Sequence, residues 1–365
     1  MSTETLLTRV GRLDDRSAPT RPLPLGRPRL PGWAAPVIGA TSAVSATATG
    51  LLLGWSTAGI TVLAVLLFAV ALPLASRLAE GPRAARDRLV TVLVWSALGV
   101  ALVPLVSLTV TVVHDGIGVV DAQFLTYSMR NVVGEGGGIY HAIMGTLLVT
   151  LAAALLSVPV GLLSAIYLVE YAGGSRAARV LSFLVDVMTG IPSIVAGLFA
   201  YAVLVLFFGE GVRMGLGGSL ALSVLMVPIV VRSCEEMLRL VPHDLREASY
   251  ALGVPQWRTV LKVVLPTALP GIITGVMLAV ARVVGETAPL LIVAGSTDSL
   301  NLDLFSERMM TLPVFIYSSF TQPGVPAEYG VDRAWGAALV LIVIVVALNV
   351  LARLLGRLVS RRSGR

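Results

Sequence analysis

Charged residues are scarce in this chain: Asp, Glu, Lys and Arg make up 13% of its 365 residues, whereas apolar side chains make up 56%. A soluble domain carries roughly a quarter charged residues, and runs of about 20 apolar residues are typical of membrane-spanning helices. The composition therefore predicts an all-α polytopic membrane protein and excludes a soluble globular fold. The net charge of +6 then bears on membrane orientation and does not indicate nucleic-acid binding.

Cysteine, histidine and lysine are also nearly missing. Cys234 is the one cysteine, which excludes an intramolecular disulfide and a cysteine-based metal cluster. The three histidines lie far apart in the sequence, so no metal-ligand pair at helical spacing occurs. The one lysine, Lys262, is flanked by Leu261 and Val263, so the chain lacks the Gly-Lys-Ser/Thr element of a phosphate-binding P-loop. Any ATP that drives its function must be hydrolysed by another chain.

Eight apolar runs are long enough to span a membrane. They cover about residues 33–55, 57–76, 89–113, 142–171, 180–208, 215–231, 266–294 and 334–356. The first two form a hairpin, and the Arg- and Pro-rich residues 1–32 predict a disordered cytosolic tail. With eight spans both termini share one side, and the Arg-rich tail, loops and C-terminus all fall on it. By the positive-inside rule that side is the cytoplasm.

The longest polar interruption in the second half, residues 244–266, predicts two short helices separated by a sharp stop. Asp244 is expected to cap the first helix, with Glu247 at the capping-box spacing, and Gly253 to end it in a left-handed conformation. One side of this helix is apolar and consists of Leu245, Ala248, Ala251 and Leu252. Such a segment is either an amphipathic linker on the membrane surface or a docking helix for a cytoplasmic partner.

Of the ionisable residues within the predicted spans, where charges are costly and indicate function, three stand out: Asp186, Arg282 and Glu286. Arg282 and Glu286 are four residues apart and can pair on one helical face. The pair either ties helices together, or Arg282 offers its planar donor fork to an oxyanion while Glu286 holds or releases it. Asp186 lies about one turn before the Gly190-Ile191-Pro192-Ser193 break in the fifth span, and can simply cap backbone amides freed there.

Three segments resemble known permeases. Glu247-Ala248-Ser249, Gly253 and Val263-Val264-Leu265-Pro266 resemble the EAA loop of binding-protein-dependent ABC importer permeases, with Ser249 in place of the second alanine. Residues 281–291 (ARVVGETAPLL) and 190–197 (GIPSIVAG) are similar to two span segments of the PstA family of phosphate importer permeases. The resemblance covers roughly Leu89 to the C-terminus.

The resemblance implies a type I ABC importer permease fold. A permease core at residues 80–365, with its family-typical domain at 141–356, would follow two extra N-terminal transmembrane helices at 33–79. Residues 244–266 would be the coupling loop, which meets a separate ATPase through Leu245, Arg246, Glu247, Ala248, Ser249 and Gly253. Arg282 and Glu286 would lie on the phosphate path, and we add Asp186, Thr287 and Ser193 as further candidates.

In that family the permease pairs with a homologous, PstC-like permease. Two copies of a cytoplasmic ATPase carry the ATP and Mg, and an extracytoplasmic protein delivers phosphate. We therefore expect a non-catalytic subunit of the bacterial plasma membrane, with both termini cytoplasmic and no metal or cofactor of its own. The residues leave open an importer of another oxyanion, such as molybdate, sulfate or phosphonate. A stand-alone channel or an intramembrane enzyme is the alternative from a different class.

Overall fold

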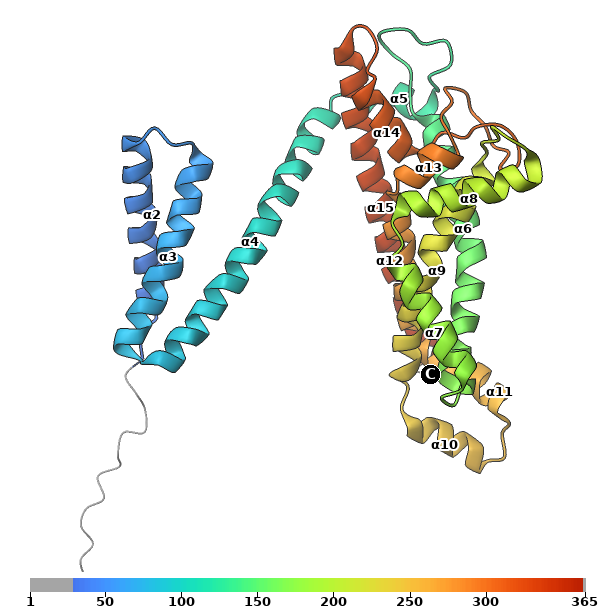
Figure 1. The fold of residues 1–365 in the computed structure, drawn as a ribbon, viewed down its shortest axis with the longest axis horizontal. Helices are drawn as coiled ribbons and strands as arrows, with labels where there is room; N and C mark the ends of the chain where they lie inside the picture. Colours follow the sequence, from blue (N-terminus) through green and yellow to red (C-terminus); the bar gives the residue numbers. More distant parts are fainter. Residues whose placement is uncertain (1–28, 364–365) are drawn as a thin grey trace, which may run out of the picture. The chain divides into compact units, whose positions relative to one another are not determined.

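Residues 29–363 are described by a computed structural model, and they are helical apart from turns and connecting loops (Figure 1). Of the predicted disordered tail, residues 1–28 lie outside the described residues. The chain divides into two compact units, residues 1–108 and residues 109–365, at a point within helix α4 (Pro82–Gly116). Each unit is described by itself.

The first unit contains α2 (Ala34–Leu52), α3 (Thr57–Ala79) and the first part of α4. The α2 residues that are buried are all small and are spaced by multiples of four: Ala34, Ser42, Ala46 and Gly50. Small residues allow two helix backbones to approach closely inside a membrane. At Gly50 a Cβ atom would lie 2.2 Å from Cγ1 of Ile60 on α3, so the contact between the two helices requires glycine there.

A bundle of long helices forms the second unit. Helices α6 (Tyr140–Ile166) and α9 (Gly215–Arg239) pack along each other, and α12 (Leu265–Val284) packs against both α9 and α15 (Ala327–Ser363). Buried serines fasten α9 to α6: Ser219 Oγ donates to the Val149 carbonyl at 3.2 Å and Ser223 Oγ to the Ala153 carbonyl at 3.3 Å. These bonds satisfy polar groups that would otherwise be costly in an apolar interior.

The two ends of this bundle differ. At one end lie α5 (Ala122–Thr126), α13 (Ala288–Val293) and α14 (Leu312–Thr321), and at the other lie α10 (His243–Ala251) and α11 (Gln256–Thr259) (Figure 1). We call the end that carries α10 the docking end. Two π-helical turns also lie in its connections: η1 (Tyr167–Tyr171) follows α6, and η2 (Val260–Val264) precedes α12.

Within residues 29–363, seven helices are long and apolar enough to cross a membrane. An eighth crossing arises if α7 (Arg176–Thr189) and α8 (Ser193–Phe208), which are bent by 110° at their junction, form one span. This agrees with the predicted eight spans. The predicted limits of the seventh span were wrong. The helix already begins at α11, runs through η2 and α12 without interruption, and stops at Val284, because Gly285 breaks it there before α13 starts.

Candidate functional site

The break between α7 and α8 occurs where the sequence predicts it. Gly190 follows the last turn of α7, and Pro192 occupies the N-cap position of α8 with φ −60° and ψ 137°. Proline lacks an amide hydrogen and disfavours helical geometry in the residue before it, here Ile191. The chain therefore leaves one helix and starts another at a steep angle, with the first amides of α8 free of helical partners.

A second break separates α12 from α13. Gly285 follows Val284 at the end of α12, the Glu286 amide donates back to the Val283 carbonyl at 3.1 Å, and Pro289 stands in the first turn of α13. The two breaks are neighbours in space. A Cβ atom at Gly197 in α8 would lie 2.7 Å from the Pro289 Cα atom, so only glycine lets these helices touch. The two segments that resemble permease signatures thus meet, and we call this place the break junction.

Arg282 and Glu286 lie on either side of the end of α12. The ion pair that their spacing suggests is absent, because the helix stops at Val284 and Glu286 lies beyond it. Within residues 29–363 neither side chain makes an ion pair or a side-chain hydrogen bond. Arg282 is exposed on this chain, whereas Glu286, Thr287 and Ser193 are half-buried beside the break junction. All donors of this planar guanidinium group are thus available within the described residues, and an oxyanion could accept two of them.

Asp186 has a different partner from the backbone amides expected. Its carboxylate accepts a hydrogen bond from Nη2 of Arg232 on α9, and the same nitrogen donates to Ser182 Oγ at 3.0 Å. The other nitrogen, Nη1, donates to Glu235 at 2.6 Å, and Arg239 reaches the second oxygen of Glu235 at 2.5 Å. A row of alternating charges therefore joins α7 to α9. Sequence reasoning missed it, although Glu235 lies at helical pairing distance from both arginines.

The docking helix α10 begins at His243, two residues earlier than a cap at Asp244 would place it. The predicted cap at Asp244 was wrong: Pro242 holds the N-cap position, and no side chain caps the helix. Pro242, with φ −58°, already has the backbone angle that leads into the helix, so Asp244 falls in the first turn. There its negative charge interacts favourably with the positive end of the helix dipole. The stop was right. Gly253 has φ +75°, and the Val254 amide bonds to the Ser249 carbonyl at 3.2 Å.

The expected apolar side of α10 is exposed on this chain. Leu252 is 83% and Leu245 41% exposed to solvent, and Glu247 and Ala248 are also exposed. An apolar side that finds no cover within its own chain is typical of a contact surface for another molecule. We call Leu245, Glu247, Ala248 and Leu252 the docking face.

Arg246 points away from the docking face and into the bundle. It donates from Nη2 to Glu170 Oε1 at 2.7 Å and from Nε to the same oxygen at 3.1 Å, and these side chains keep only 10% and 4% of their surface. Nη1 donates to the Val241 carbonyl at 2.6 Å, and Nη2 also to the Leu238 carbonyl at 3.0 Å. One guanidinium group thus ties α10 to the ends of α6 and α9. Arg246 therefore anchors the docking helix from within.

Two further contacts complete this anchor, which we call the clamp. Ser249 Oγ lies 2.8 Å from Thr259 Oγ1, and both residues are buried, so α10 is also joined to α11 at the start of the α12 span. The Gln256 side chain donates to the Glu170 carbonyl. Glu170 lies in η1, and Thr259 directly precedes η2. π-Helical turns often occur at functional positions in membrane helices and elsewhere.

No group of three or more His, Cys, Asp or Glu side chains within residues 29–363 is arranged to hold a metal ion.

Comparison with known proteins gives matches over the same region. The family model described as "Binding-protein-dependent transport system inner membrane component" matches residues 157–365. The chain is 46% identical over 283 residues to "Phosphate transport system permease protein PstA 1" of Mycobacterium tuberculosis, which covers 77% of this chain and 91% of that protein. It is 37% identical over 273 residues to the PstA protein of Yersinia pestis, covering 75% of this chain and 90% of that protein.

Among solved structures, the chain resembles one from a crystal structure of a bacterial alginate ABC transporter in complex with an alginate pentasaccharide-bound periplasmic protein. The TM-score is 0.53, with 12% sequence identity, and the match covers 76% of this chain and 96% of that chain. At this identity the likeness concerns the fold alone.

Proposed function

The chain belongs to the family of binding-protein-dependent transport system inner membrane components, and we propose that it is the PstA-like permease subunit of an ATP-driven importer of inorganic phosphate. The observation that carries the proposal is the guanidinium group of Arg282, which lies near the end of α12, is exposed and makes no ion pair within residues 29–363. A guanidinium group without a carboxylate partner can bind a phosphate oxyanion through two parallel hydrogen bonds. The names of the PstA relatives support phosphate as that oxyanion.

The break junction offers further groups suited to an anion. Helix α8 begins at Ser193, and the first amides of a helix have no partner within it and carry a partial positive charge. Glu286, with no cationic partner in the described residues, would repel an anion and so limit its dwell time near Arg282. Thr287 and Ser193 each supply a half-buried hydroxyl group on the two segments that meet at the break junction. Together they form a weak, transient phosphate site, as a transport path requires.

Coupling to ATP runs through the docking end in this proposal. A cytoplasmic ATPase, present in two copies and holding the ATP and Mg, would contact the docking face around Glu247 and Ala248. The clamp passes its movement from α10 into α6, α9 and α12, since Arg246 and Ser249 join α10 to all three. The helical bundle then alternates between two openings. A PstC-like subunit supplies the other half of the path, and an extracytoplasmic binding protein delivers phosphate. Both termini and the docking end face the cytoplasm.

Phosphate uptake tests this function in cells that lack the chain and are complemented with variants. Arg282→Gln should abolish uptake while the protein still assembles in the membrane, because the amide cannot provide the charge or the donor fork. Arg130→Gln, a change at an exposed arginine outside the spans, serves as the matched control and should transport normally. Uptake by Arg282→Gln at the wild-type rate would refute the assigned role.

Competing anions separate the remaining alternatives. Excess unlabelled phosphate should suppress uptake, whereas molybdate, sulfate and a phosphonate should do so weakly. If one of these anions suppresses uptake as strongly as unlabelled phosphate does, the importer also transports that oxyanion. Uptake that persists without ATP hydrolysis would instead indicate a channel.

A further inference from the structure

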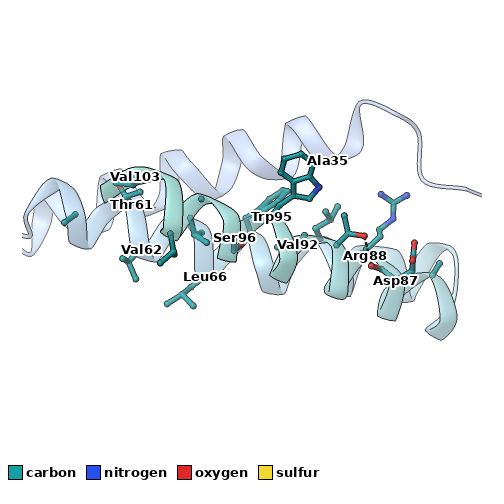
Figure 2. A pocket seen from close by; sticks show the side chains of 18 of the residues that line it. Ala35, Thr61, Val62, Leu66, Asp87, Arg88, Val92, Trp95, Ser96 and Val103 are labelled. Carbon is teal, nitrogen blue, oxygen red and sulfur yellow. Dashed lines mark hydrogen bonds between the residues drawn. The ribbon is translucent and has the colours of Figure 1, made fainter. Parts of the chain in front are cut away.

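The N-terminal unit contains a large groove that the transport function does not use. It lies between α3 and α4, within residues 29–104, and has a volume of 1720 Å³ (Figure 2). Its walls come mainly from apolar side chains of two membrane-spanning helices, among them Val62, Leu66, Val92 and Val103. Pockets for drug-sized molecules have volumes of about 300–1,000 Å³. This groove is therefore suited to a larger, elongated apolar molecule.

One end of the groove is charged, and the rest is not. Arg88 and Asp87 lie at one end, Thr61, Val62 and Val103 at the other, and Trp95 between them (Figure 2). The α3 wall runs from Thr57 to Leu72, about 22 Å at 1.5 Å per residue. A hydrocarbon core is about 30 Å thick, so this length exceeds that of one lipid leaflet. A molecule with a charged head and long apolar chains fits this pattern.

The charged end is held in place by a buried polar cluster. Glu80 accepts hydrogen bonds from the Leu30 amide at 2.6 Å, from Ser76 Oγ at 2.6 Å, and from Nε and Nη2 of Arg88, each at 3.0 Å. These bonds lower the pKa of Glu80 to about 2, with the Arg88 contact as the largest cause. Glu80 is thus fully charged at neutral pH and fixes the orientation of Arg88. The third nitrogen of Arg88, Nη1, makes no hydrogen bond within the described residues.

The charge around this end favours an anion. Residues 29–90 contain five arginines against two acidic residues, Glu80 and Asp87, and Glu80 is already neutralised by Arg88. Arg29, which also lines the groove, is exposed and has no side-chain partner within the described residues. An apolar protein helix in the groove would leave Arg29 and Nη1 of Arg88 without a partner. An anionic headgroup would pair with them, as basic sites at the cytoplasmic ends of membrane helices do with acidic lipids.

We propose that the groove between α3 and α4 binds an anionic phospholipid, with its phosphate between Arg29 and Nη1 of Arg88 and its acyl chains along Leu66 and Trp95. The lipid fills the space between the N-terminal hairpin and α4. It thereby adds to the packing between α3 and α4, which are joined by the Glu80 cluster.

Trp95 reports on the occupant, because its indole ring lines the groove and is 67% exposed on the chain. The full-length chain is reconstituted in phosphatidylcholine vesicles with increasing fractions of phosphatidylglycerol that carries brominated chains, which quench nearby indoles. The difference between the wild type and Trp95→Phe isolates the signal from this residue. Brominated phosphatidylcholine serves as the headgroup control. We expect Trp95 to be quenched at a several-fold lower fraction of the anionic lipid.

Removing one groove arginine tests the headgroup contact. Arg29→Gln should raise the half-quenching fraction about five-fold, which corresponds to the roughly 1 kcal/mol that one arginine contributes near an anionic surface. Arg77→Gln removes the same charge from α3 at a position that does not line the groove, and should have an effect below about two-fold. Equal quenching by both lipids, equal effects of the two variants, or no quenching at all would overturn the proposal. The last result would indicate a protein helix in the groove.

Discussion

The clamp at the docking end makes the most direct energetic prediction. Arg246 and Glu170 are both buried, and the guanidinium group also satisfies the carbonyl groups of Leu238 and Val241 at the end of α9. Removing one partner of a buried ion pair leaves an uncompensated charge and costs about 3–5 kcal/mol. Arg246→Met should therefore weaken the attachment of α10 by that amount. The α6–α9 interface should not change, because its serine hydrogen bonds do not involve the clamp.

Hydrogen exchange of the α10 amides measures this effect locally. A loss of about 3–5 kcal/mol corresponds to exchange that is roughly 10²- to 10⁴-fold faster in residues 243–251. Arg258→Met provides a matched control, since this arginine is exposed and only stacks over Trp257 at 5.0 Å. It should change exchange by less than ten-fold, because an exposed cation–π contact contributes about 0.5–1 kcal/mol.

A double variant separates the ion pair from other effects of the substitution. Replacing a whole buried pair by apolar side chains is often close to neutral. Glu170→Leu combined with Arg246→Met should therefore recover much of the protection that either single change removes. Wild-type exchange in Arg246→Met, or a double variant whose loss equals the sum of the two single losses, would refute the clamp. In transport assays the single variants should bind the ATPase yet couple its hydrolysis poorly to uptake.

Two further predictions concern other parts of the chain. Because the folded-state pKa of Glu80 is lowered to about 2 from an ordinary value of 4.5, its contribution to stability is present above pH 4.5 and is lost as the pH falls towards 2. The thermal unfolding temperature of the N-terminal unit should therefore fall over this pH range. In Glu80→Gln this fall should be much smaller. Gly197→Ala should cost about 1–3 kcal/mol and reduce uptake, because its Cβ atom meets the backbone of Pro289 at 2.7 Å. Gly190→Ala, whose nearest contact is 3.6 Å away, should be tolerated, and equal effects of the two changes would contradict the close approach of α8 and α13.

Features that depend on the local chain were predictable from the sequence. Long apolar runs marked the spans, since a helix must satisfy its own backbone groups inside a membrane. Gly190 and Pro192 marked the bend in the fifth span, and Gly253 marked the end of the docking helix, because these residue types restrict or extend the allowed backbone conformations. The break at Gly285 was missed, although glycine was visible there, because the apolar run continues beyond it.

Features that depend on tertiary contacts were not predictable. Periodicity identified an apolar side on α10 but not that it lies uncovered, nor that Arg246 on the opposite side is buried. Asp186 and Arg232 are 46 residues apart, so their pairing depends on how α7 packs against α9. In the sequence, Glu170 stands only at the end of the apolar run of residues 142–171. Its role emerged only when the fold brought it against an arginine 76 residues later.

The continuous helix from Gln256 to Val284 links the two functional ends. Thr259 near its start is held to the docking helix by Ser249, and Arg282 lies near its far end, about 35 Å away at 1.5 Å per residue. A hydrogen-bonded helix is stiff along its axis, so movement of α10 reaches Arg282 as a displacement of the whole rod. Glu286 lies beyond the break and need not follow. In the proposed transport path, the distance between Arg282 and Glu286 can therefore change with the state of the docking end, whereas an unbroken helix would have fixed that distance.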